Sequence, residues 1–176
     1  MSEKAASALL STDRAIVFDE KDASRIWNKG HFGEYHGGNL ELSMLEALFL
    51  MEQGRLALTD GAGKEISYKQ LYTDCTKKYE NFVSTFDAYK DLRARGYIVK
   101  TGFKFGAHFR LYPKGTNPGE GHSDFLVNVL SEEYPFSLQD LSRSVRLSHS
   151  VKKKIWYAVV DSEGDLTYYE IVRVKP

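Results

Sequence analysis

Apolar and polar positions in the first half of the chain alternate between strand-like and helix-like patterns. Residues 14–19 predict a short strand, and residues 20–30 predict a short helix that ends at a glycine. Residues 42–54 carry a broad apolar face at helical spacing and predict a second helix. Ser43 and Glu46 at its start have the spacing of a capping box, in which each side chain accepts a hydrogen bond from the other residue's backbone N–H.

Further elements follow in this half of the chain. Residues 33–39 are typical of a loop or an edge strand, and residues 55–60 of a strand. Ser67 can cap another helix that runs to about Tyr79. These elements predict a small N-terminal α/β domain over residues 1–80.

The second half begins with a helix and continues mostly as strands. Residues 79–96 have aromatic and apolar residues at helical spacing, and we expect this helix to open a second domain over residues 81–176. It is followed by a strand-like run broken by two glycines (97–112), a buried-type strand (123–130), a helix capped by Ser137 (137–149), and two strands joined by a turn (154–161 and 166–174). This order predicts a mixed β-sheet flanked by helices, in an α+β or α/β fold.

Composition excludes some kinds of site but does not by itself indicate a function. The formal net charge is zero, so any binding of nucleic acid must depend on a local basic patch. A single cysteine, Cys75, excludes an intramolecular disulfide and a zinc site built from thiolates. We find neither a signal peptide nor an apolar run of the roughly 20 residues that cross a bilayer, so we expect a cytoplasmic protein with no membrane partner.

A long loop separates two polar aromatic side chains, Tyr112 and His122. A tight hairpin needs only a few residues, and this connection is longer. The ordinary interpretation is a half-buried strand tyrosine and a loop histidine. The alternative is a site, because binding and catalytic groups are common on loops held by rigid strands.

A basic segment lies further along the chain, where a polar stretch enters a buried strand. In an extended segment Lys152 and Lys154 point to one side and Lys153 to the other, so one lysine can differ in role from its neighbours. With Arg143 and Arg146 these lysines form a local basic patch that can contact phosphates. The common interpretation of such a patch is a solvated strand end.

An acidic turn joins the last two predicted strands. Asp161, Glu163 and Asp165 lie at its tip, which is either a polar β-turn or an anionic knob that docks into a basic pocket of another subunit. In the strand that follows, the adjacent Tyr168 and Tyr169 face opposite ways, and one of them can stack on a base.

No phosphate-binding loop, nucleophile elbow or pair of metal-ligand histidines occurs in the sequence. If Tyr112, His122 and Lys153 converge, they suit transesterification within RNA, in which a ribose 2′-OH attacks the adjacent phosphorus and the 5′-oxygen leaves. That reaction needs a general base, a general acid and a cation beside the charged phosphoryl oxygens. It requires no cofactor and no metal. DNA, which lacks the 2′-OH, cannot react in this way.

The segments GFKFGAHFRLYPKG, HSDFLV, RLSHSVKKK and YAVVDSEGDLTYYEI resemble, in that order, the sequence blocks of the archaeal tRNA-splicing endonucleases. LSMLEALFLMEQGRL is similar to the smaller N-terminal domain of that family. The resemblance implies a C-terminal restriction-endonuclease-like domain. It also implies an enzyme that excises introns from precursor tRNA by cutting both strands of a bulge–helix–bulge, leaving 2′,3′-cyclic phosphate and 5′-hydroxyl ends.

The resemblance also implies roles for single residues. Tyr112 corresponds to the general base, His122 to the general acid, and Lys153 to the cation that stabilises the transition state. Arg146 corresponds to an arginine that grips a bulged base, and Tyr168 is a plausible partner in that grip.

For assembly, the resemblance implies that the acidic tip at Asp161, Glu163 and Asp165 docks between dimers. A homotetramer is favoured, and a heterotetramer with a structural subunit is the alternative. Two other functions stay open at this point: a structural or RNA-binding subunit that works through a partner chain, and a metal-dependent nuclease on a restriction-type fold.

Overall fold

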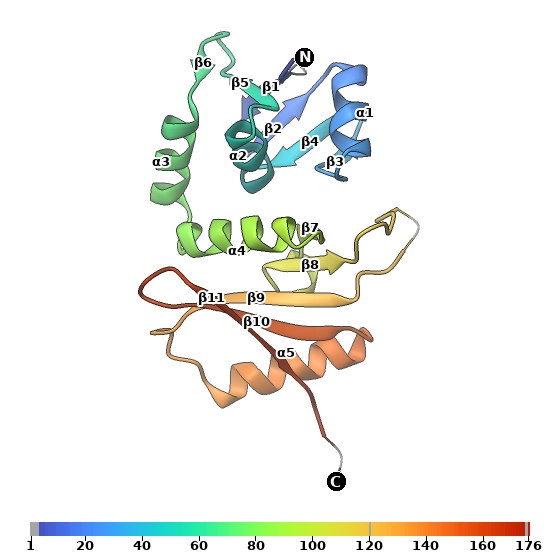
Figure 1. Cartoon of the computed structure of the whole chain (residues 1–176), viewed down its shortest axis with the longest axis vertical. Helices are drawn as coiled ribbons and strands as arrows, with labels where there is room; N and C mark the ends of the chain where they lie inside the picture. Colours follow the sequence, from blue (N-terminus) through green and yellow to red (C-terminus); the bar gives the residue numbers. More distant parts are fainter. Residues whose placement is uncertain (1–3, 120, 175) are drawn as a thin grey trace. The chain divides into compact units, whose positions relative to one another are not determined.

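The computed structural model describes residues 4–119, 121–174 and 176, and it divides into two compact units. The first unit is Met1–Phe82 and the second is Val83–Pro176. Each unit has its own β-sheet with helices beside it (Figure 1). Both sheets mix parallel and antiparallel pairs, so the predicted α+β class of mixed sheets flanked by helices is confirmed.

The first unit has a six-stranded sheet in the order β3-β4-β2-β1-β5-β6. Its β1–β5 pair is parallel and its other pairs are antiparallel. Its strands are β1 (Ala6–Ser11), β2 (Arg14–Val17), β3 (Glu34–His36), β4 (Asn39–Ser43), β5 (Leu56–Thr59) and β6 (Glu65–Ile66), and its helices are α1 (Glu20–Asn28), α2 (Met44–Glu52) and α3 (Tyr68–Lys78).

The helix starts in this unit follow from local hydrogen bonding. Ser43 Oγ accepts from the Glu46 N–H at 3.3 Å, and Glu46 Oε2 accepts from the Ser43 N–H at 2.9 Å, which confirms the capping box. The second oxygen of Glu46 accepts from the Gly33 N–H at 2.8 Å, so this buried carboxylate also fixes the segment before β3. Ser67 caps α3 as predicted, through the Gln70 N–H at 3.2 Å.

Three strands of the first unit were not predicted: β1, β4 and the two-residue β6. The inward positions at the start of β1 are Ala6 and Ala8, and alanine is uncommon in strands. In β4 only Leu40 and Leu42 point inward, and the strand runs directly into the helix that follows. The two-residue β6 is too short to show a period-2 pattern, and the pattern in β4 covers only five residues.

The second unit has a five-stranded sheet in the order β11-β10-β9-β8-β7. The β9–β10 pair is parallel and the others are antiparallel. Its elements are α4 (Phe82–Ala94), β7 (Ile98–Thr101), the 3₁₀ turn η1 (Phe103–Phe105), β8 (Phe109–Tyr112), β9 (Phe125–Ser131), α5 (Leu138–Ser150), β10 (Lys154–Val160) and β11 (Leu166–Ile171). The last strand therefore ends three residues before the predicted position 174.

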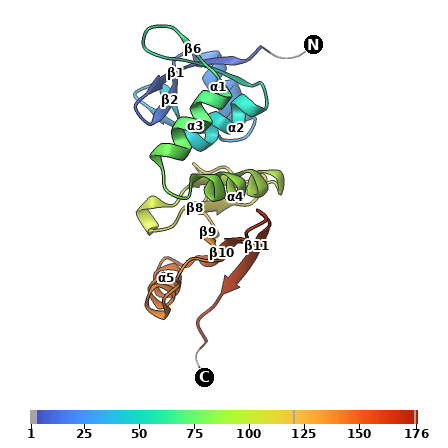
Figure 2. The same cartoon turned by 90° about the vertical axis from the view of Figure 1, so that its left-hand side faces the viewer.

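The two helices of this unit lie on opposite faces of its sheet, as Figures 1 and 2 show. On one face Leu126, Ile155 and Tyr157 form a buried cluster against Leu141 and Val145 of α5. We call this the α5 face and the opposite one the α4 face. Side chains alternate between the faces along each strand, so strand register decides which helix each residue meets.

Candidate active site

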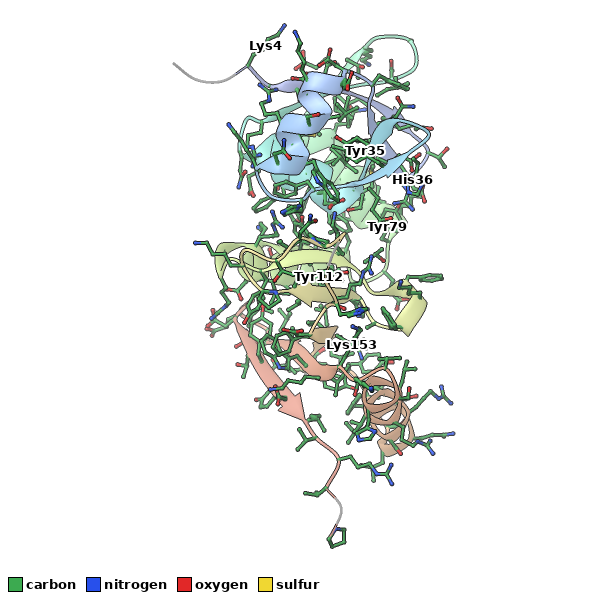
Figure 3. All side chains as sticks on the ribbon, turned by 90° about the vertical axis from the view of Figure 1, so that its right-hand side faces the viewer. Lys4, Tyr35, His36, Tyr79, Tyr112 and Lys153 are labelled. Atoms are coloured by element: carbon green, nitrogen blue, oxygen red, sulfur yellow. The ribbon has the colours of Figure 1, made fainter. Side chains whose placement is uncertain are left out.

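Three strand ends meet at one end of the second sheet. Because β8 is antiparallel to β9 and β9 is parallel to β10, the end of β8 lies beside the starts of β9 and β10. Tyr112 closes β8, His122 lies three residues before β9, and Lys153 directly precedes β10. The structure therefore places the three predicted catalytic residues at the same end of the sheet, and Figure 3 shows Tyr112 and Lys153 in this part of the second unit.

Lys153 is anchored in the segment that leads into β9. Its ammonium donates a hydrogen bond to the carbonyl oxygen of Ser123, the residue after His122. The same Nζ lies 5.6 Å from the ring centroid of Phe105 in η1. Ser123 is buried, with 4% of its surface exposed, so this bond fixes both the lysine and the base of the loop that carries His122.

The charge of Lys153 is only partly compensated by its neighbours. Burial lowers the pKa of its ammonium, and the nearby Arg110 and Lys104 lower it further, while Asp124 acts in the opposite direction. The net shift of the pKa is downward, with burial as its largest cause, and the charges that act on the ammonium are two cations and one anion. A partly desolvated cation acts more strongly on a nearby anion than one in bulk water does.

Tyr112 is buried beside an arginine. Only 3% of its surface is exposed, and the guanidinium carbon of Arg110 lies 5.7 Å from its ring centroid. Arg110 pairs with Leu126, a member of the cluster on the α5 face, so alternation along β8 also directs Tyr112 to that face. The sequence analysis missed Arg110, although its position two residues before Tyr112 on a strand was an available signal.

His122 is exposed, at the end of a loop whose base is hydrogen-bonded. The Asp124 N–H donates to the Leu111 carbonyl at 3.0 Å, which extends the β8–β9 ladder up to the loop. Further out, the Gly121 N–H donates to the Asn117 carbonyl at 2.9 Å. His122 therefore lies between a fixed base and a tight turn, open to a ligand from solvent.

The other two lysines of the predicted basic patch have different surroundings from Lys153. Lys154 pairs with Glu170 at 3.4 Å and lies 5.8 Å from the Phe125 ring centroid. Lys152 is exposed, with a left-handed backbone (φ 54°). The residues that line a shallow pocket here are Asp124, Phe125, His149, Ser150, Lys152, Lys153 and Lys154.

The predicted base grip is not assembled within one chain. Arg146 is exposed on α5, and it lines an apolar groove together with Leu141 and Arg173. Tyr168 lies on the α4 face, where its hydroxyl donates to Asp91 Oδ2 at 2.8 Å. The sheet thus separates Arg146 from Tyr168. The sequence analysis missed Arg173, which lies near Arg146 only because β11 and α5 pack together.

The acidic tip is a self-contained turn. Asp161 Oδ1 accepts from the Glu163 N–H at 2.9 Å and from the Asp165 N–H at 2.8 Å, so this carboxylate builds the turn. Glu132 accepts from the Ser162 N–H at 2.8 Å and ties the turn to the end of β9. Glu163 and Asp165 are exposed, and they carry the charge that a partner can meet.

Among residues 4–119, 121–174 and 176, no group of three or more His, Cys, Asp or Glu side chains is arranged to hold a metal ion. No helix in this described part of the chain is long and apolar enough to span a bilayer.

Comparison with known proteins covers most of the chain. Residues 6–72 match the model of the tRNA intron endonuclease N-terminal domain, and residues 82–168 match that of the tRNA intron endonuclease catalytic C-terminal domain. The chain belongs to the tRNA intron endonuclease family. The site formed by the ends of β8, β9 and β10 lies in the part that matches the catalytic domain.

Similar proteins come from several archaea, and each is named tRNA-splicing endonuclease. The chain is 44% identical to the one from Thermococcus onnurineus over 166 residues, which are 94% of this chain and 95% of the relative. It is 42% identical to that of Methanothermobacter thermautotrophicus over 154 residues, 88% of this chain and 89% of the relative. It is 38% identical to that of Methanococcus maripaludis over 173 residues, 98% and 97% of the two chains. The resemblance drawn from the sequence blocks is confirmed, and the chain is an endonuclease of tRNA splicing.

Proposed function

We propose that this tRNA intron endonuclease cuts precursor tRNA at a bulge–helix–bulge by transesterification within RNA. The 2′-OH of the ribose attacks the adjacent phosphorus, the bond to the 5′-oxygen breaks, and the ends are a 2′,3′-cyclic phosphate and a 5′-hydroxyl. The reaction is metal-independent and needs no cofactor. The observation that carries the proposal is the position of Tyr112, His122 and Lys153 at the same end of the sheet.

Tyr112 is the proposed general base, which takes the proton of the 2′-OH. A tyrosine acts as a base only in its deprotonated form, and a cationic neighbour stabilises that form. Arg110, 5.7 Å from the Tyr112 ring, supports that role. Only 3% of Tyr112 is exposed, so this role requires the ribose to reach that small exposed area.

His122 is the proposed general acid, which gives its proton to the departing 5′-oxygen. Its exposure and its place at the end of a hydrogen-bonded loop support the role, because histidine is the side chain most often used in general acid–base catalysis.

Lys153 is the proposed cation beside the phosphoryl oxygens. Its carbonyl anchor and its partly buried, cation-rich surroundings support this role, because a preorganised charge stabilises a developing anion without rearranging during the reaction.

Arg146 is the proposed contact for a bulged base, in the groove that Arg173 also lines. Tyr168 stays a predicted second contact. Its hydrogen bond to Asp91 on the other face supports a structural role equally well.

Assembly sets the distance between the two cuts. We propose a homotetramer in which the exposed Glu163 and Asp165 at the acidic tip dock into a basic surface of another copy. A heterotetramer with a structural subunit is the alternative. The exposure of both carboxylates, while Asp161 is used within the turn, supports docking through this tip.

The test uses the purified chain alone with an end-labelled RNA that contains a bulge–helix–bulge, in excess EDTA. We expect two cuts, each with cyclic-phosphate and 5′-hydroxyl ends, and no cut where a 2′-deoxyribose replaces the attacking nucleotide. Cutting only after Mg²⁺ is added would contradict the mechanism. No cutting under either condition would contradict a self-sufficient enzyme and favour the heterotetramer with a partner chain.

A further inference from the structure

The turn between β7 and β8 holds an aromatic ring out into solvent. Phe103 is 88% exposed, more than any other Phe, Tyr or Trp among the described residues. Burying a phenylalanine ring is worth about 1.5–3 kcal/mol, so an exposed ring of this size adds little to the fold of a free chain. The ring is therefore available to contact a ligand.

The backbone of this turn is tightly defined. The Gly102 N–H donates to the His108 carbonyl at 3.1 Å, and the Gly106 N–H donates to the Phe103 carbonyl at 2.9 Å. A Cβ on Gly102 would lie 2.8 Å from the Ala107 carbonyl oxygen, so the close approach needs glycine. At its far end the turn is tied to β9, because His108 Nδ1 accepts from the Val129 N–H at 3.2 Å. Phe103 is thus presented by a fixed support rather than by a loose loop.

The same turn borders the cationic site. Phe105, two residues after Phe103, lies 5.6 Å from Lys153 Nζ and packs on the α5 face. Lys104 Nζ lies 5.2 Å from the ring centroid of Phe105, and its charge lowers the pKa of Lys153, after the larger effects of burial and Arg110. Figure 2 shows this short turn, between β7 and β8, on the same side of the sheet as α5. An exposed ring and three cations therefore occupy one border of the proposed active site.

We propose that Phe103 is a stacking platform for an unpaired base of the RNA substrate, and that Lys104 contacts the phosphate of that nucleotide. This inference rests on the proposed function and adds a binding residue to it. A nucleotide offers a flat π-face and an anion within one unit, which fits a ring beside a lysine. An apolar protein surface would match the ring but would bring no anion to the neighbouring Lys104.

The measurement is the affinity of the full chain for a bulge–helix–bulge RNA with 2′-deoxyribose at both cleavage sites, so that binding is separated from cutting. We expect Phe103→Ala to weaken binding about 5- to 100-fold, the usual value of one base stacked on an aromatic ring. Phe103→Tyr keeps the π-face and should bind close to wild type. Phe103→Leu keeps apolar bulk without the π-face and should resemble the alanine variant.

Tyr134→Ala is the matched control, because this tyrosine is also exposed (46%) and lies after β9, at the other end of the sheet from Lys153. We expect its affinity to equal that of wild type. Removing bulge bases one at a time as abasic sites then identifies the stacked base. At one position the difference between wild type and Phe103→Ala should vanish, because the two changes remove the same contact.

Equal binding by wild type and Phe103→Ala would overturn the inference. So would a loss of assembly in Phe103→Ala, measured as molecular mass by light scattering, because the ring would then pack against protein. The same preparations are assayed for cutting of the all-ribose RNA. Wild-type cutting together with unchanged Phe103→Ala binding would refute this inference alone, whereas a wild type that neither binds nor cuts would refute the proposed function as well.

Discussion

Polar side chains on the two faces of the C-terminal sheet have different kinds of partners. On the α4 face the polar groups pair with one another: Tyr168 donates to Asp91, and the Trp156 indole donates to Glu170 at 2.8 Å. On the α5 face, at the end of the sheet, the charges that act on Lys153 are the cations Arg110 and Lys104 and the opposing Asp124. Paired charges are typical of structural roles, and an excess of one sign prepares a site for a ligand of the other sign.

The largest expected effect concerns the proposed active site at the end of the sheet. His122→Ala should slow cutting by about 10²–10⁴-fold, the usual contribution of a general acid, while binding of uncleavable RNA stays nearly unchanged. Single-turnover cutting and filter binding measure the two quantities. His36→Ala, an exposed histidine in the first unit, is the control. An equal loss of binding in His122→Ala would show that His122 stabilises the loop and does not act as the general acid.

The next largest effect is expected from Lys153, which points to the opposite face of the sheet from its neighbour Lys154. Lys153→Met should lower the single-turnover rate by about 10²–10³-fold, because it removes one preorganised charge from the transition state. Lys154→Met should cost much less, because Lys154 is paired with Glu170. The comparison of the two rates is the measurement. If Lys154→Met were the more damaging, the assignment of the catalytic lysine by strand register would be wrong.

A smaller effect concerns the α4 face. Tyr168→Phe should lower the free energy of unfolding by about 1–2 kcal/mol, because it removes a hydrogen bond to a carboxylate. Urea denaturation at several pH values measures it. Tyr169→Phe, exposed on the neighbouring position of β11, is the matched control. A large loss of RNA binding with unchanged stability would favour the predicted RNA contact instead.

The difference in free energy of unfolding between wild type and Tyr168→Phe depends on pH through Asp91. Burial alone would raise its pKa, but hydrogen bonds from Arg95 and Tyr168 outweigh burial and lower it. The unfolded chain therefore takes up this proton first as the pH falls. The stabilisation is complete above the ordinary pKa of an aspartate and is lost as the pH falls through the lowered value. The gap between wild type and Tyr168→Phe should shrink over that acidic range.

The smallest expected effect tests the acidic tip. Neutralising Glu163 and Asp165 together, as Gln and Asn, should weaken the proposed tetramer about two- to tenfold, since exposed ion pairs are worth little. Sedimentation at several concentrations measures the dissociation. Asp13→Asn with Glu65→Gln changes the net charge equally in the first unit and serves as control. An unchanged tetramer in the tip variant would contradict docking through these carboxylates.

Asp161 separates turn structure from charge at the same tip. Asp161→Asn keeps an oxygen that can accept from the Glu163 and Asp165 N–H groups, whereas Asp161→Ala removes it. We therefore expect Asp161→Ala to disturb the conformation of the turn, even if the charge of Asp161 is not used in docking. The same contrast explains why the sequence predicted an acidic turn but not which carboxylate builds it.

Helices were more predictable than strands because their signals are local. The caps at Ser43, Ser67 and Ser137 each bond a backbone N–H three residues away, and all three were identified from sequence. The strand β1 was missed because its buried positions are alanines. Its strand conformation depends on pairing with Leu56–Thr59, which is about fifty residues distant in the chain.

By itself the sequence determined the capped helices, the acidic turn and the blocks that mark the tRNA intron endonuclease family. These features depend on residue types within a few positions of one another. Only the tertiary structure decided that Lys153 faces Arg110 while Lys154 faces Glu170, and that Tyr168 lies across the sheet from Arg146. Such relations depend on strand order, direction and register, which arise from pairing between distant segments and leave no local pattern in the chain.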